Sequence, residues 1–158
     1  MSRREIREQV FKLLFRIEFN KQSEMSEQLE LFFGNQVDDV EDIPQDTSGE
    51  SLEELEKLAL AQKEQEEKDK AEITDKYERI ISKRAEIDKS IEEKAVGWNL
   101  KRMGKVDLTL LRLAVFEIMF DDEIPTSVAI NEAVELAKKF GQDESPSFVN
   151  GVLAKFAK

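Results

Sequence analysis

The stretch from residue 124 to 155 carries two consecutive amphipathic helix patterns, which restrict the fold more than any other part of the chain. The apolar residues of the first pattern recur at steps of three and four, which places them on one helical face; they are Ile130, Ala133, Val134, Ala137 and Phe140. Pro125 and Thr126 are typical of a helix start, and Gly141 is typical of a helix end. Ser145 as N-cap and Pro146 as first helical residue then begin a second helix. The two patterns together predict a helical hairpin.

The N-terminal helix, predicted from about Arg3 to Phe19, carries two neighbouring stripes. The first is apolar and predicted to be buried; it holds Ile6, Val10, Leu13, Leu14 and Ile17. The second holds Arg4, Arg7, Phe11, Phe15 and Phe19. Phe11 borders the apolar face and is expected in the core, whereas Phe15 is covered either by the protein's own fold or by a partner. Arg3, Arg4 and Arg7 are either solvated surface charges or ligands for phosphate groups.

The remaining helices are predicted from the same periodicity. A short helix from about residue 23 to 33 ends at Gly34, and the apolar pattern returns from residue 73 to 96. The positions expected in the core there are Ile73, Tyr77, Ile80, Ile81, Ile87, Ile91 and Val96, with Trp98 as a large anchor. A central helix follows from about Val106 to Phe120, where Asp107 is suited to cap or to favour the positive N-terminal dipole. Six or seven helices without a strand hairpin predict an all-α fold of two packed helical bundles on one continuous core.

The segment between residues 35 and 71 breaks this pattern. Residues 35–50 contain Pro44, Gly49 and five acidic residues between Asp38 and Asp46, a composition that buries too little apolar surface to fold alone. Residues 51–54 match a capping box, which predicts the start of a helix. Residues 62–70 then contain only charged residues and glutamine.

Composition argues against catalysis. The 158 residues suit one domain and include neither cysteine nor histidine, which excludes disulfides, thiolate metal sites and histidine general bases within the chain. No glycine-rich phosphate loop occurs. We therefore expect no enzyme activity, no cofactor and no metal site. No apolar run of 18 residues is present, so a soluble, cytoplasmic protein is expected.

The net charge of −11 is unevenly distributed. Residues 1–21 hold six basic and three acidic residues, residues 22–99 hold ten and 23, and residues 100–158 hold eight and nine. The acidity is therefore concentrated in the middle of the chain. A basic N-terminal helix beside a nearly neutral C-terminal region is compatible with RNA binding, provided that the acidic segment points elsewhere.

Several ordered stretches resemble the NusB family of bacterial transcription antitermination factors. The run VAINEAVELAKKFG at residues 128–141, followed by FVNGVL at 148–153, is similar to the family's C-terminal hairpin. WNLKRM at 98–103 leading into VDLTLLRLA at 106–114 is similar to its central helix, and the start of the chain, with Arg3, Arg4 and Arg7, is similar to its first helix. The resemblance covers residues 1–34 and roughly 72–158. Because the family has a tighter connection between these parts, it implies an acidic, partly helical and partly mobile insertion at about 36–71.

The resemblance implies a non-catalytic RNA-binding adaptor in antitermination. Such a protein joins the small-subunit ribosomal protein also known as NusE, engages boxA RNA and helps RNA polymerase pass terminators, notably in ribosomal RNA operons. The family positions near RNA correspond to Arg3, Arg4, Arg7, Glu144 and Phe148, although Phe148 is either a base-stacking ring or part of the core. The positions that contact the protein partner correspond to Phe15 and Asp107. Some members of the family are dimers and others are monomers.

Two alternatives remain open. The acidic segment suits a helical interaction module that recruits a basic protein without RNA function. An RNA methyltransferase appendage is the other alternative, since related helical domains are fused to such enzymes, but no catalytic domain or cofactor motif follows Lys158.

Overall fold

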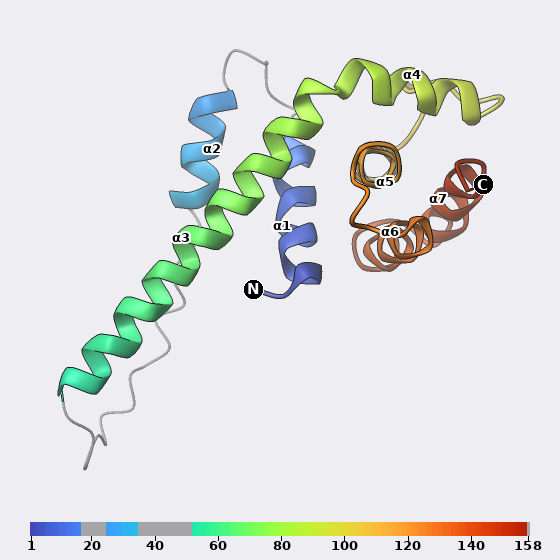
Figure 1. The fold of residues 1–158 in the computed structure, drawn as a ribbon. Coiled ribbons are helices and arrows are strands. Elements are labelled where there is room, and N and C mark those ends of the chain that lie inside the picture. Colours follow the sequence, from blue (N-terminus) through green and yellow to red (C-terminus); the bar gives the residue numbers. More distant parts are fainter. Residues whose placement is uncertain (17–24, 35–51, 158) are drawn as a thin grey trace.

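The computed structural model describes residues 1–16, 25–34 and 52–157, the second range with side chains from residue 30 onward. These ranges form helices and connections, with no strand among them, so the predicted all-α class is confirmed (Figure 1). The helices are α1 (Arg3–Phe15), α2 (Met25–Gly34), α3 (Leu52–Ser82), α4 (Arg84–Lys94), α5 (Lys105–Phe120), α6 (Thr126–Phe140) and α7 (Ser145–Ala154).

The central helix α5 is the centre of the fold. All ten residues from Leu108 to Glu117 are buried, because α1, α3, α4, α6 and α7 all pack against this helix. Figure 1 looks along the axis of α5 and shows α1, α4, α6 and α7 around it. Residues of α1 to α7 contribute to one cluster of buried apolar side chains. The expectation of one continuous core is therefore confirmed.

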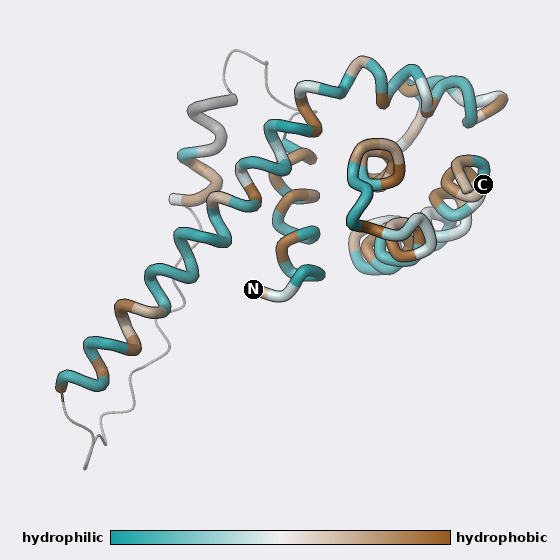
Figure 2. Tube along the Cα trace, in the orientation of Figure 1, coloured by the Kyte–Doolittle hydropathy of each residue, from teal (hydrophilic) through white to brown (hydrophobic). Residues whose placement is uncertain are grey.

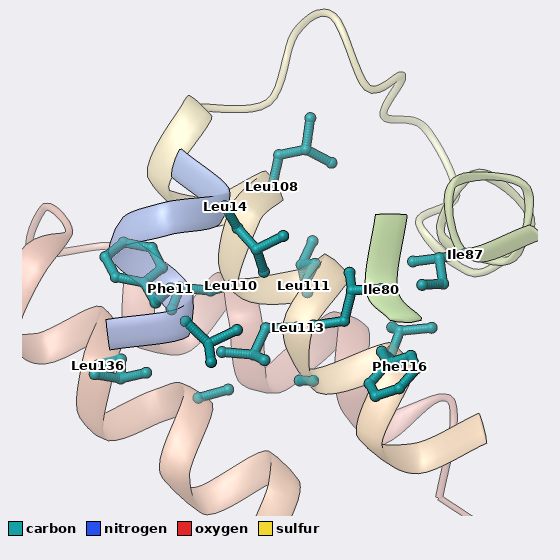
Figure 3. Close-up of a cluster of buried hydrophobic side chains, with 14 of the residues drawn as sticks. Phe11, Leu14, Ile80, Ile87, Leu108, Leu110, Leu111, Leu113, Phe116 and Leu136 are labelled. Atoms are coloured by element: carbon teal, nitrogen blue, oxygen red, sulfur yellow. The ribbon is translucent and has the colours of Figure 1, made fainter. Parts of the chain in front are cut away.

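The first helix packs against α5 through its predicted apolar stripe. Ile6, Val10, Leu13 and Leu14 are buried, and Figure 3 shows Leu14 beside Leu108 and Leu111 of α5. Phe11 is buried as well. The described part of α1 ends at Phe15, and the predicted continuation to residue 19 lies outside the described residues.

The third helix is continuous across the boundary predicted at about residue 71. It has 31 residues and is therefore about 46 Å long. Residues 52–68 are exposed apart from the half-buried Leu55, and this half projects away from the other helices (Figures 1 and 2). Asp69 is the first buried residue, and its Oδ2 lies 3.0 Å from the N-terminal ammonium group. Ile73, Tyr77 and Ile80 then enter the core, as predicted.

Two residues predicted to be buried are exposed. Val96 is 78% and Trp98 51% exposed. The reason is that α4 ends at Lys94 and the chain turns at Gly97, whose φ of +87° lies in the left-handed region that favours glycine. The turn interrupts the helical period before it reaches these two side chains. The sequence-based prediction of a core anchor at Trp98 was therefore wrong.

The C-terminal hairpin is formed by α6 and α7. α6 starts at Thr126 without a side-chain cap, and it ends with Gly141 as C-cap. Gly141 has an ordinary φ of −91°, but a Cβ atom built there lies 2.5 Å from the Cβ of Ser145. Glycine is thus needed for space. Glu144 is the N-cap of α7, one residue before the predicted one, and the buried Ser145 instead accepts a hydrogen bond from the Gln142 N–H at 3.0 Å.

Candidate functional site

Arg4, one of two exposed arginines at the start of α1, contacts α6. The Ser2 hydroxyl accepts a hydrogen bond from the Glu5 N–H and so caps α1, and Arg3 beside it is exposed. Arg4 donates from Nε and Nη2 to the two carboxylate oxygens of Glu132, at 3.0 and 2.9 Å. These hydrogen bonds raise the pKa of Arg4 and lower that of Glu132. The pair is largely neutral, so Arg4 attracts an anion less than a free arginine would.

Arg7 lies in a buried ion cluster. It is therefore neither a solvated surface charge nor an exposed ligand for phosphate, the two alternatives that the sequence left open. Its Nε and Nη2 donate to the carboxylate of Glu117 at 2.8 and 3.2 Å. Lys76 donates to the same carboxylate at 2.8 Å. Arg7 is 7% exposed and Glu117 is fully buried. The guanidinium therefore joins α1 to α5 inside the protein, and although it borders a groove at the start of α1, its Nε and Nη2 donors are taken up by Glu117.

A groove of about 830 Å³ lies between the start of α1, the inner half of α3 and residues 120–125. Charged groups of both signs line it: the basic ones are Arg3, Arg4, Arg7, Lys76 and Arg79, and the acidic ones are Glu72, Asp75, Asp121, Asp122, Glu123 and Glu132. Because the two signs are mixed, the groove lacks the uniformly positive potential that concentrates a polyanion.

Phe15 and Asp107 lie at the same end of the α1–α5 pair. The two helices are antiparallel, because Arg7 bonds Glu117 near one end while Leu14 lies beside Leu108 at the other (Figure 3). Phe15 follows Leu14, and Asp107 precedes Leu108. The structure thus brings the two predicted partner-binding residues to one end of the molecule, although Arg7 and Arg4 lie toward the opposite end.

The side chains of Phe15 and Asp107 are both half-buried. The Phe15 ring lies 6.1 Å from that of Phe11, so the protein's own fold covers part of it. Asp107 is in the first turn of α5, but the N-cap is Gly104 and no side chain caps the helix. Its Oδ1 is buried without a hydrogen-bond partner. Buried carboxylate oxygens are rarely left in this way, and because this atom is closed to solvent, an outside group would meet the half-buried carboxylate through its electrostatic field.

Glu144 lies in the turn between α6 and α7, and Phe148 lies in the first turn of α7. Glu144 is exposed, whereas Phe148 is half-buried and packs against the core. The Phe148 ring also meets the exposed Trp98 edge to face, with centroids 5.3 Å apart. Phe148 therefore packs against the core on one side and contacts the exposed Trp98 ring on another.

The predicted RNA-binding residues of α1 and those at the start of α7 lie at different points along α6. Arg4 bonds Glu132, whereas Phe140, at the end of α6, precedes the turn that carries Glu144. Eight helical residues separate Glu132 from Phe140, which corresponds to about 12 Å. The five predicted RNA-binding residues therefore do not form a single patch.

The sequence did not predict that Glu117 and Lys76 form a buried ion cluster, nor that Trp98 is exposed. Helical periodicity places Glu117 on a helix but reveals no partner 110 residues away. A signal for Trp98 was present in Gly97, since a glycine directly before it marks a turn. Within the described ranges, no three acidic side chains converge as possible metal ligands, and no helix there is long and apolar enough to cross a membrane.

Comparison with known proteins assigns a family to this fold. A model of the NusB family matches residues 31–158. The Transcription antitermination protein NusB of Agathobacter rectalis is 48% identical over 157 residues, which cover 99% of this chain and 100% of that protein. The protein of the same name from Lachnoclostridium phytofermentans is 46% identical over 98% of each chain. The crystal structure of T. maritima NusB superposes with a TM-score of 0.72 at 30% identity, covering 99% of this chain and 91% of that one.

Proposed function

Because the chain belongs to the NusB family, we propose that it acts in transcription antitermination as an adaptor that binds RNA and a ribosomal protein. Its partners are the NusE-type small-subunit protein and boxA-type single-stranded RNA, and the assembly helps RNA polymerase pass terminators, notably in ribosomal RNA operons. Its function requires no chemical step, because the protein acts by bringing these partners together. The names of the relatives support antitermination, and the site geometry supports the finer assignments below.

The observation that carries the adaptor function is that Phe15 and Asp107, the sequence neighbours of Leu14 and Leu108, lie toward the same end of the α1–α5 pair. A basic partner would place a positive charge beside the half-buried Asp107 carboxylate and would cover the exposed part of the Phe15 ring. This end is therefore the proposed partner-binding surface.

RNA binding is proposed at two places. At the start of α1, Arg3 and Arg4 neutralise phosphates, and Arg4 exchanges Glu132 for RNA when it does so. At the start of α7, Phe148 offers the exposed part of its ring to a base, whereas Glu144, the N-cap of this helix, limits affinity through charge repulsion. Arg7 supports the first place indirectly, because its bonds to Glu117 fix the start of α1 on the core.

The partner surface is tested with two charge-changing variants. We expect Phe15→Asp and Asp107→Lys each to weaken binding of the NusE-type protein by about tenfold or more, as for residues near the centre of an interface. The circular dichroism spectrum and the melting temperature should remain close to those of the wild type. Glu56→Lys, on the exposed half of α3, is the matched control and should bind normally. Normal binding by both test variants would contradict the proposal.

The RNA surface is tested on boxA RNA with and without the partner. Arg3→Ala and Arg4→Ala should weaken binding and flatten its dependence on salt, because each lost phosphate contact removes about one released counterion. Glu144→Gln should keep or strengthen binding, since it removes a repulsive charge. Unchanged affinity and salt slope in the arginine variants would show that the start of α1 does not contact RNA.

One observation favours a second function. Leu52, Leu58 and Leu60 are more than half exposed on the projecting half of α3, among acidic residues. This surface suits a protein-interaction module that binds a basic partner. Replacing Leu58 and Leu60 with glutamine discriminates between the two functions. If the protein is the proposed adaptor, its affinity for the NusE-type protein should change by no more than a few-fold. If it binds its partner through the projecting half of α3, this binding should be lost.

A further inference from the structure

The connection between α4 and α5 presents an exposed aromatic side chain on a fixed backbone. The backbone N–H of Trp98 donates to the Ala95 carbonyl at 3.0 Å, and the Asn99 Oδ1 accepts a hydrogen bond from the backbone N–H of Arg102 at 2.9 Å. Ala95 itself is buried. The connection is thus held as two successive turns, and the exposure of the indole results from a defined local structure.

Helix α7 supports this connection from the side. The Trp98 and Phe148 rings meet at an interplanar angle of 64° with centroids 5.3 Å apart. Lys155, just after α7, donates from Nζ to the Lys94 carbonyl at 2.9 Å and so ties the ends of α7 and α4 together. In an edge-to-face pair of this kind the exposed half of the indole stays available to a further ring.

The segment of sequence that carries the indole is basic. Residues 94–105 include Lys94, Lys101, Arg102 and Lys105 and no acidic residue, and residues 145–157 include Lys155 and no acidic residue. Lys101 and Arg102 are exposed. This concentration stands out in a chain of net charge −11. Acidic groups occur only beyond it, at Glu92 and Glu93 on α4, Asp107 on α5, and Asp143 and Glu144 before α7.

We propose that Trp98 stacks on a base of single-stranded RNA, while Lys101 and Arg102 hold the adjoining phosphates and Phe148 supports the indole from behind. The inference rests on the proposed RNA-binding function and names a contact surface within it. An aromatic ring beside cations is the combination that binds single strands, because every base has a face to stack and every nucleotide carries a phosphate. Exposed Val96, next to the indole, extends the apolar surface that a base would cover.

Trp98 is the only tryptophan of the chain, so its own fluorescence tests the proposal. The wild-type protein, alone and with its NusE-type partner, is titrated with a twelve-nucleotide single-stranded RNA that contains boxA, and binding is followed in parallel by the anisotropy of an end label. We expect the indole emission to change along the same isotherm as the anisotropy. Trp98→Ala should weaken binding by about five- to 150-fold, the range for losing one stacked base. Trp98→Phe, which keeps an aromatic ring beside Phe148, should retain most of the affinity.

The cations are tested by salt dependence. Lys101→Gln and Arg102→Gln should each reduce the slope of log affinity against log salt by about 1. Lys63→Gln, an exposed lysine on the projecting half of α3, is the matched control and should leave the slope unchanged.

The outcomes separate this inference from the proposed function. If the wild type binds RNA but the indole emission is constant and Trp98→Ala binds normally, the inference is wrong and the RNA-binding function stands. If the wild type binds no RNA with or without its partner, both fail. If the emission changes only on addition of the partner protein, the surface docks protein, and the inference is also wrong.

Discussion

Glu117 is a fully buried carboxylate that holds two cations, Arg7 and Lys76, from two other helices. We predict that Glu117→Ala lowers the free energy of unfolding by about 3–5 kcal/mol, because it leaves two cations without their buried partner. Urea unfolding followed by circular dichroism measures this change. Glu56→Ala, at an exposed site on α3, should stay within about 0.5 kcal/mol of the wild type. A loss below 1 kcal/mol for Glu117→Ala would mean that the cluster is solvated in solution.

Glu132 makes stability depend on pH. The hydrogen bonds from Arg4 lower its pKa below the ordinary value of 4.5 and outweigh the opposite effect of burial. The ionised carboxylate therefore stabilises the fold above pH 4.5, and this contribution is lost as the pH falls through the lower pKa of the folded state. We predict that Glu132→Gln is less stable than the wild type at pH 7 and that the difference shrinks below pH 4.5, as measured by melting temperature. Arg4→Ala should show the same profile, and a difference independent of pH would refute this origin.

Residue-level roles were the hardest to predict from the sequence. Arg4 and Arg7 lie on the same predicted stripe, yet one is exposed beside Glu132 and the other is buried against Glu117. Periodicity gives the face on which a residue lies and carries no information on which distant helix covers that face. The two arginines could therefore be separated only with the positions of α5 and α6 known.

At the scale of elements, the close approach of α6 and α7 depends on Gly141. A Cβ atom there would lie 2.5 Å from the Ser145 Cβ and 2.8 Å from the Ala137 carbonyl oxygen. We predict that Gly141→Ala lowers the free energy of unfolding by about 1–3 kcal/mol through overpacking. Gly151→Ala is the matched control: nothing lies within 4 Å of a Cβ atom there, so it should stabilise α7 by up to about 1 kcal/mol. Equal effects of the two changes in thermal unfolding would contradict the argument.

The two halves of α3 should differ in their contribution to stability. Proline interrupts a helix at either place, but only residues 69–82 contact the core. We predict that Lys63→Pro lowers the helical circular dichroism signal with little change in melting temperature, whereas Glu78→Pro costs about 3 kcal/mol or more. A large fall in melting temperature for Lys63→Pro would show that the projecting half is part of the cooperative unit.

Helical periodicity identified most elements but not all their limits. The apolar stripe of α1 and the core positions of α3 were predicted correctly, because each recurs with the helical period. The charged run at 62–70 has no such period, so the sequence did not show that α3 is continuous there. The prediction for Trp98 was wrong for the converse reason: the periodic run before it favours a buried aromatic residue, but the turn at Gly97 ends the run.

At the scale of the whole molecule, the proposed RNA contacts of α1 and α7 lie beside the middle and the C-terminal end of α6. Arg4 lies beside Glu132, at least about 12 Å along α6 from the turn that precedes Phe148, and the two share no partner. We predict that the effects of Arg4→Ala and Phe148→Ala on RNA affinity add within about 0.5 kcal/mol in the double variant. Trp98→Ala and Phe148→Ala, whose rings touch, should not add. Strong coupling between Arg4 and Phe148 would contradict their separate placement.

The projecting half of α3 also determines how the molecule moves through water. A compact chain of 158 residues has a radius of gyration of about 15 Å, whereas residues 52–68 of α3 extend the molecule by about 26 Å beyond the body. Such an extension raises the frictional coefficient of the molecule but adds little to its mass. A monomer therefore diffuses slowly for its mass and elutes early from a gel-filtration column, at a position that a more compact, heavier protein would share. Light scattering measures molar mass independently of molecular shape, and it therefore distinguishes this monomer from a dimer.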